Sequence, residues 1–278
     1  MLKHREVGDW IDERQERFIT ISDTIWEYAE VALAETKSCQ LQAEDLEADG
    51  FRVTRNVGGL PTALVAEWGE GAPIIGFLGE YDALPELSQK NQAAQDPLVP
   101  GGAGHGCGHN LLGTASLAAA SAVKSWLQAT GRKGTVRYYG CPAEETGAGK
   151  VFMARDGAFA DLDAAITWHP GSKISVMRGS SLAIDHATFR FFGKTAHAAG
   201  APEMGRSALD AVELMNIAVN YLRERVIESA RIHYVITNGG GQPNVVPAEA
   251  EVWYYIRAPR RDQVDPITQR ILTIAEAA

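Results

Sequence analysis

The stretch PIIGFLGEY, residues 73–81, is a short apolar run that begins at a proline and ends on a glutamate and a tyrosine. Apolar, β-branched runs of this length between turn residues are typical of buried strands. Three further segments have the same character: TALVAEW (62–68), GTVRYYGC (134–141) and DAAITWH (163–169). Residues 111–130 have the length and composition of a helix, with Asn110 as the expected N-cap. Helices interleaved with buried strands predict a layered α/β domain with a mostly parallel sheet.

A different pattern begins after about residue 179. Residues 181–193 alternate between apolar and polar side chains, and residues 205–226 form a long helical pattern. Two more alternating runs, RIHYVITNG and AEVWYYIRA, precede a final helical segment. The order strand, helix, strand, strand, helix is that of a ferredoxin-like unit whose last strand is missing. We therefore predict two domains, residues 1–180 and 181–278, and expect the second to be incomplete in this sequence.

The composition limits the kind of partner. Twenty-six basic and thirty-five acidic side chains give a net charge of -9, which disfavours nucleic acid and anionic membranes, because phosphate binding depends on clustered lysine and arginine. A small molecule or a peptide is the expected partner. The N-terminal residues lack an apolar signal core, and no apolar run approaches the roughly 20 residues of a membrane-spanning helix. We therefore predict a cytoplasmic location. The three cysteines are too few for a disulfide framework.

Polar side chains follow three of the expected strands. Glu80 and Asp82 come at the end of the first, Glu144 and Glu145 follow the second, and His169 ends the third. In open α/β sheets, ligands bind outside the carboxyl ends of the strands. We therefore expect these five side chains at one rim of the sheet.

A glycine-rich segment, GGAGHGCGHNLL (101–112), places Cys107 and His109 one residue apart. Together with histidine and glutamate from strand ends, this pair offers the sulfur, nitrogen and oxygen donors that suit zinc or a neighbouring divalent transition metal. The glycines allow the loop backbone to aim both side chains inward. Taken alone, one Cys-x-His pair fits equally well a small buried cysteine beside a polar loop histidine.

The adjacent glutamates strengthen the metal hypothesis. Glu144 and Glu145 repel each other at the end of an apolar strand unless a cation neutralises one of them. If Glu145 binds metal, Glu144 is free to act as the base that takes a proton from the attacking water. Asp82 suits a carboxylate that orients a metal ligand.

Four motifs together resemble the M20 metallopeptidase family in its amidohydrolase branch: GEYDALPEL (79–87), GHGCGHNLLG (104–113), CPAEETGAGK (141–150) and WHP (168–170). Residues 193–224 and 233–259 are also similar to the family, so the resemblance covers nearly the whole chain. It implies a layered α/β hydrolase domain with two divalent metal ions, Mn²⁺ or Zn²⁺, and an inserted ferredoxin-like lid or dimerisation domain. The implied reaction is hydrolysis of an N-acyl or N-aroyl amino acid amide such as p-aminobenzoyl-glutamate.

The resemblance also implies a set of metal ligands. Cys107 takes the position that bridges the two ions, His109 and His169 complete one site, and Glu145 belongs to the other. In most of the family a His-x-Asp motif supplies a ligand where this chain has Glu80, Tyr81 and Asp82, and His109 looks like the replacement. The family's last metal histidine lies in a C-terminal segment that this sequence does not contain, so we expect the Glu145 site to be only partly formed.

The remaining implied roles concern proton transfer and the substrate. Glu144 is the implied general base and acid, and His197 corresponds to a lid histidine that reaches across a dimer and stabilises the developing oxyanion. Asn244 and Arg257 match positions that bind the substrate carboxylate, for which a bidentate guanidinium is well suited. The implied assembly is a homodimer, or a heterodimer with a related subunit, formed through the lid domain.

Two other hypotheses stay open from the residues themselves. The chain could be a catalytically incomplete binding or assembly subunit, which needs no occupied metal site. Alternatively, it could be a metal-free thiol hydrolase with Cys107 as nucleophile and His109 or His105 as base, whose activity resists chelators.

Overall fold

The computed structural model describes residues 4–176 and 179–278, which form two compact units that divide between Ile174 and Ser175. Among the helices of these described residues, none combines the length and the apolar character needed to span a bilayer. The cytoplasmic location stays a prediction from the sequence.

A five-stranded sheet forms the centre of the first unit, with strand order β1-β2-β4-β3-β5. Its strands are β1 (Arg52–Arg55), β2 (Leu64–Glu70), β3 (Ile74–Glu80), β4 (Gly134–Cys141) and β5 (Ala164–Ile166). Strand β3 is parallel to β4 and β5, whereas β2 is antiparallel to β1 and β4. The expected layered α/β fold is confirmed, and its sheet is mixed, with the parallel strands grouped at β4-β3-β5.

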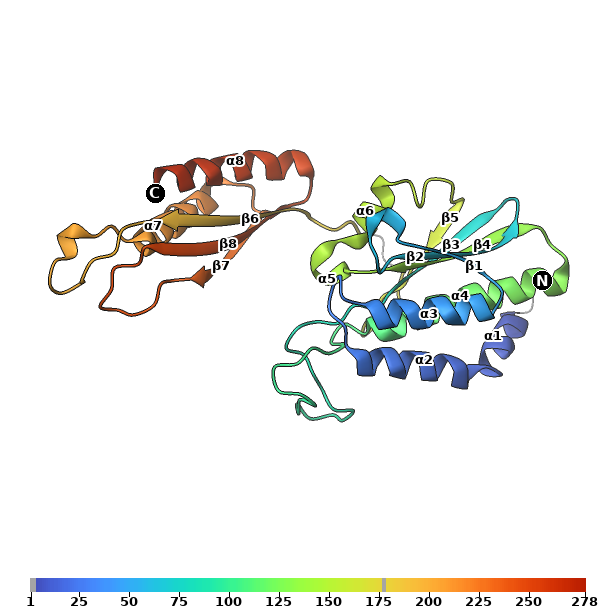
Figure 1. Ribbon diagram of the computed structural model, residues 1–278. Helices are drawn as coiled ribbons and strands as arrows, with labels where there is room; N and C mark the ends of the chain where they lie inside the picture. Colours follow the sequence, from blue (N-terminus) through green and yellow to red (C-terminus); the bar gives the residue numbers. More distant parts are fainter. Residues whose placement is uncertain (1–3, 177–178) are drawn as a thin grey trace. The chain divides into compact units, whose positions relative to one another are not determined.

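Helices cover both faces of this sheet (Figure 1). They are α1 (His4–Asp12), α2 (Gln15–Tyr28), α3 (Thr36–Ala48), α4 (His109–Thr130), α5 (Glu144–Gly147) and α6 (Gly149–Arg155), with a 3-10 turn η1 (Val57–Gly59). Figure 1 shows α3 and α4 on one face with α2 outside them, and α6 on the other face. The main core includes Ile25, Leu46, Leu117 and Val136, all without exposed surface. Periodic apolar positions on α2, α3 and α4 thus bury against the apolar strands, as the pattern predicts.

The carboxyl ends of the parallel strands define one rim of the sheet. Glu80, the last residue of β3, is in register with Cys141, the last residue of β4. Gly113 on α4 lies so close to this rim that a Cβ atom there would be 2.3 Å from the backbone oxygen of Glu80. The absence of a side chain at Gly113 therefore lets the first turns of α4 pack directly on the end of β3.

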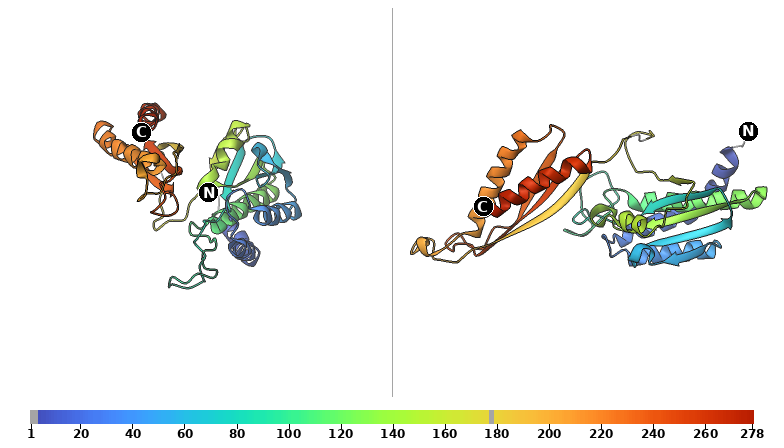
Figure 2. Two further views of the ribbon diagram at one scale, coloured as in Figure 1. Left: turned by 60° about the vertical axis from the view of Figure 1, so that its left-hand side comes forward. Right: turned by 90° about the horizontal axis from the view of Figure 1, so that it is seen from above.

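The second unit is a three-stranded antiparallel sheet with two helices on one face, as Figure 2 shows. Its strands β6 (Ala183–Phe192), β7 (Arg231–Asn238) and β8 (Glu249–Ala258) lie in the order β6-β8-β7. Helices α7 (Ala208–Leu222) and α8 (Arg261–Ala277) are accompanied by short 3-10 turns, η2 (Pro202–Met204) and η3 (Arg223–Arg225). Val252, Tyr254 and Ile256 are fully buried, while the side chains between them are not. The apolar residues of the alternating pattern therefore lie on the face of the sheet that the helices cover, and the residues between them lie on the open face.

Candidate metal centre

A left-handed turn at Gly108 joins Cys107 to His109, the first residue of α4. Gly108 has a φ of +77°, and a Cβ atom there would lie 3.0 Å from Pro170 Cγ. A glycine is needed here because other residues rarely adopt this conformation. The turn starts the helix earlier than expected, so the prediction of Asn110 as N-cap is wrong; its side chain instead donates a hydrogen bond to Ser22 Oγ at 3.1 Å.

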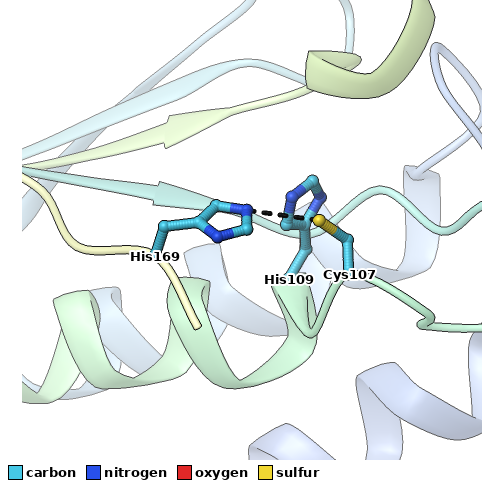
Figure 3. A group of neighbouring side chains, drawn as sticks. All are labelled: Cys107, His109 and His169. Carbon is cyan, nitrogen blue, oxygen red and sulfur yellow. Dashed lines mark hydrogen bonds between the residues drawn. The ribbon is translucent and has the colours of Figure 1, made fainter. Parts of the chain in front are cut away.

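Cys107, His109 and His169 point toward one another (Figure 3). Cys107 Sγ lies 3.2 Å from His169 Nε2, and the rings of His109 and His169 meet edge to face with centroids 5.8 Å apart. His169 Nδ1 lies 2.9 Å from the carbonyl oxygen of Pro170, so this nitrogen carries the proton and Nε2 presents its lone pair. The three ligand atoms all lie within 4.8 Å of one another. Ligands held about 2.0–2.3 Å from one zinc ion are about 3–4 Å apart. The 3.2 Å between Cys107 Sγ and His169 Nε2 lies in this range, so these two atoms fit a single ion.

Asp82 fixes the orientation of the His109 ring. His109 Nδ1 is 2.9 Å from Asp82 Oδ1 and 3.0 Å from the Asp82 carbonyl oxygen, and both of these atoms are acceptors. Nδ1 therefore donates, and Nε2 faces the site without its proton when the ring is neutral. The other oxygen of Asp82 accepts a hydrogen bond of 2.9 Å from the backbone N–H of Glu145. A carboxylate that orients a ligand histidine in this way is common at metal sites.

Three glutamates lie around His109 Nε2. The distances from this nitrogen are 3.0 Å to Glu80 Oε2, 3.9 Å to Glu144 Oε2 and 4.0 Å to Glu145 Oε1. Within the described part of the chain, His109 Nε2, Glu80 Oε2 and Glu145 Oε1 are buried and have no hydrogen-bond partner. Buried polar atoms are nearly always paired, so three unpaired ones around one point need an explanation. A bound divalent cation supplies it, because a nitrogen lone pair and carboxylate oxygens are metal donors.

Burial and neighbouring charges raise the pKa values of three residues of the site, Glu144, His109 and Cys107. Burial, and then the charge of Glu80, raises the pKa of Glu144, which favours proton exchange closer to neutral pH. Burial lowers the pKa of His109, but the hydrogen bond to Asp82 and the charges of Asp82 and Glu80 outweigh it and raise that pKa. Burial, followed by Glu145, raises the pKa of the Cys107 thiol to about 11. Without a cation this thiol is protonated at neutral pH and is a poor nucleophile, which counts against the thiol hydrolase.

His105 is separate from this group although it lies in the same loop. Its Nε2 is 3.0 Å from the carbonyl oxygen of Ile25, and burial lowers its pKa to about 4. It belongs to neither group of potential metal ligands formed by the described residues.

Two residues of the site's surroundings were not found from the sequence, Glu35 and Lys150. Glu35 is fully buried and accepts hydrogen bonds from the Ala143 backbone N–H at 2.7 Å and from Thr62 Oγ1 at 2.9 Å. Ala143 has a φ of +56° and directly precedes Glu144, so Glu35 holds the unusual turn that starts α5. Lys150 on α6 forms an ion pair with Glu80 Oε1. Lys150 ends the motif CPAEETGAGK, but the motif alone does not indicate a partner for it, and Glu35, which directly precedes α3, lies in none of the quoted motifs.

The three predicted residues of the second unit lie in two places within it. His197 and Asn244 are exposed neighbours in the loops that follow β6 and precede β8, where Ala198 N donates to the Asn244 carbonyl oxygen at 3.0 Å. Arg257, near the end of β8, is in register with Ile184, near the start of β6. Within this unit, Arg257 is therefore at the opposite end of the sheet from His197 and Asn244. The carboxylate-binding roles of Asn244 and Arg257 stay predictions from the sequence.

Known proteins resemble this chain along nearly all of its length. Residues 183–278 match the peptidase dimerisation domain of the M20 family. The chain is 53% identical over 277 residues to one subunit of the p-aminobenzoyl-glutamate hydrolase of Escherichia coli (strain K12), a match that covers 99% of this chain and 58% of that protein. The chain therefore contains the dimerisation domain of the M20 peptidase family. A more distant relative, the Xaa-Arg dipeptidase of Mus musculus, is 33% identical, and the match covers 97% of this chain and 61% of that protein.

Solved structures show the same M20 fold. The aminobenzoyl-glutamate utilization protein of Klebsiella pneumoniae aligns with a TM-score of 0.72 at 19% identity, covering 98% of this chain and 74% of that chain. A dinuclear metal-binding M20 peptidase of Bacillus subtilis aligns with a TM-score of 0.65 at 22% identity, covering 94% and 69%. The chain spans about three-fifths of the length of the curated relatives it matches, 58% and 61%.

Proposed function

We propose that this chain is a metal-dependent amidohydrolase that cleaves the amide bond between an acyl or aroyl group and an amino acid. The observation that supports it most is the convergence of Cys107, His109, His169 and Glu145 around buried polar atoms that have no partner in the described structure. The substrate to test first is p-aminobenzoyl-glutamate, because the Escherichia coli relative is named as a hydrolase of this compound.

The donor set fits two divalent ions. Cys107, His109 and His169 would hold one, and Glu145 would contribute to the other. Thiolate and imidazole favour Zn²⁺, whereas the surrounding carboxylates favour Mn²⁺, so both ions belong in the test. When bound, such ions polarise the substrate carbonyl and make water more acidic.

Glu144 is the proposed proton carrier. Its side chain is 44% exposed, so it is accessible to water and substrate, whereas the neighbouring Glu145 side chain is 17% exposed. A raised pKa allows Glu144 to take a proton from the attacking water and to pass it to the departing amine nitrogen. Glu35 accepts a hydrogen bond from the Ala143 backbone N–H and so fixes the position of Glu144, the first residue of α5. Roles for His197 at the oxyanion, and for Asn244 and Arg257 at the substrate carboxylate, remain predictions from the sequence resemblance.

The proposal is tested on the purified protein with p-aminobenzoyl-glutamate. We expect divalent metal to copurify or to bind on addition, and hydrolysis to disappear on chelation and return with Mn²⁺ or Zn²⁺. Elemental analysis gives the metal per chain, and release of p-aminobenzoate gives the rate. Hydrolysis that survives chelation but stops on alkylation of Cys107 would support the thiol hydrolase instead. Protein that binds the compound without metal and without turnover would support a binding subunit.

We further propose that the second unit pairs with another dimerisation domain, from a second copy or from a related subunit. Helix α7 exposes Leu214, Ile217 and Tyr221, whose side chains are 57%, 54% and 77% exposed. Their spacing of three and four residues puts them on one face of the helix. An exposed apolar stripe of this kind is typical of a protein interface, and its domain matches a dimerisation family.

The variant Ile217→Glu is expected to shift the protein from dimer to monomer in light scattering after size exclusion, because it buries a charge in the interface. The control is Leu272→Glu on α8, which introduces the same charge at a partly exposed apolar position of the same unit. A wild-type protein that is monomeric both alone and with a related subunit, or a variant that stays dimeric, would show that α7 is not the interface.

A further inference from the structure

The two oxygens of Glu80 have different surroundings. Glu80 ends β3 and is only 6% exposed. Its Oε1 is paired with the ammonium group of Lys150. Its Oε2 is buried, makes no hydrogen bond among the described residues, and lies 3.0 Å from His109 Nε2. One oxygen is therefore already neutralised, and the other is directed at the nitrogen on which the metal centre is built.

The contact between Glu80 Oε2 and His109 Nε2 is unfavourable without a positive charge between the two atoms. The Nδ1 proton of His109 is donated to Asp82, so a neutral ring presents a lone pair at Nε2 to a negatively charged oxygen. The geometry of the contact does not meet that of a hydrogen bond. Nitrogen and oxygen ligands about 2.0–2.2 Å from one ion, at angles near 90–110°, are about 2.9–3.5 Å apart. The observed 3.0 Å lies in this range.

A second group of donors includes Glu80. Ligand atoms of Glu80, His109 and Glu144 lie within 4.8 Å of one another, as do those of Cys107, His109 and His169. Glu144 is the exposed member of this second group, whereas Glu80 and His109 are buried. Glu80 is therefore the buried carboxylate of this group, held by its ion pair with Lys150, and Glu144 is the accessible one.

We propose that Glu80 is an additional ligand of the divalent ion bound at His109, and that Lys150 positions it. The inference rests on the metal centre of the proposed function and adds a ligand to it. The ion pair with Lys150 holds Oε1, so that Oε2 alone faces the ion. The charge of Lys150 also offsets part of the repulsion among Glu80, Glu144 and Glu145, which makes a third carboxylate tolerable at this rim.

Mn²⁺ binding to the protein without substrate tests this assignment. Calorimetry gives the affinity, and the electron paramagnetic resonance spectrum of bound Mn²⁺ reports its ligands. Glu80→Ala is expected to raise the Kd for Mn²⁺ by more than about tenfold, and Glu80→Gln by less, since the amide oxygen is a weaker ligand. Lys150→Met is expected to raise the Kd and change the spectrum, and Lys150→Arg to restore both. The control is Glu70→Ala, an exposed glutamate at the far end of β2.

The outcomes separate this inference from the function on which it rests. If the wild type binds Mn²⁺ and Glu80→Gln and Glu80→Ala bind it equally well with an unchanged spectrum, Glu80 is not a ligand and the proposed hydrolase is unaffected. If the wild type binds neither Mn²⁺ nor Zn²⁺, both proposals are wrong. Should Glu80→Ala fail to fold, the isosteric Glu80→Gln decides: an unchanged spectrum and affinity there would overturn the assignment.

Discussion

Replacing Glu144 with glutamine is expected to lower the rate of amide hydrolysis by about 10²–10⁴-fold, the usual contribution of a general acid–base group. The metal content should be unchanged, because the Glu144 side chain is 44% exposed, whereas the carboxylates proposed as metal ligands, Glu80 and Glu145, are 7% and 17% exposed. The amide cannot accept a proton from water, but it keeps the size of the side chain. The rate at saturating substrate checks the loss of hydrolysis, and metal analysis of the same samples checks that the metal content is unchanged.

The matched control for this variant is Glu70→Gln. Glu70 is exposed and in register with Gly134, the first residue of β4, so it lies at the opposite rim of the sheet from Glu144. We expect no change in rate. Loss of metal in Glu144→Gln would instead show that Glu144 is a ligand, and full activity would remove it from the mechanism.

Replacing His109 with alanine is expected to raise the Kd for the divalent metal by more than about a hundredfold and to abolish hydrolysis, since outer contacts of a metal ligand alone contribute about 10–100-fold. His109 is the one residue shared by both groups of potential ligands that the described residues form. It also contacts Asp82, which holds the backbone of Glu145, so its loss disturbs both parts of the site. Metal titration by calorimetry measures the effect.

His105→Ala is the control because it removes a histidine from the same loop. His105 is bonded to the Ile25 carbonyl oxygen and stands outside both donor groups. The His105→Ala variant is expected to have a free energy of unfolding about 1 kcal/mol lower, because it loses this hydrogen bond, and an unchanged affinity for the metal. Metal binding that depends equally on both histidines would contradict the proposed centre. His109→Asn provides a second test if the alanine variant does not fold.

The rim of the sheet was predictable because it depends on local patterns. Apolar runs identify the strands, and parallel neighbours bring their carboxyl ends together, so Glu80, Glu144 and His169 could be placed at one edge from the sequence. Strand β5 is shorter than expected and ends at Ile166. His169 therefore lies beyond the strand, and its position depends on the segment that leads to Pro170.

Other features depend on contacts between distant residues, and no local pattern reports them. Glu35 and Ala143 are 108 residues apart, and Lys150 and Glu80 are 70 apart. The early start of α4 follows from the left-handed turn at Gly108, which propensity at Asn110 could not reveal. The placement of β2 beside β4, antiparallel to it, is likewise set by tertiary packing rather than by the β2 sequence.

The two hydrogen bonds of Asp82 have a consequence for how the site can vary. One oxygen accepts from the ring of His109 and the other from the backbone of Glu145, 63 residues further along the chain from Asp82. Asparagine, its nearest isostere, offers one acceptor and one donor, so one of these two groups would then face a donor. The two halves of the centre are therefore not separately adjustable: a change that turns the His109 ring also moves the start of the segment that carries Glu145.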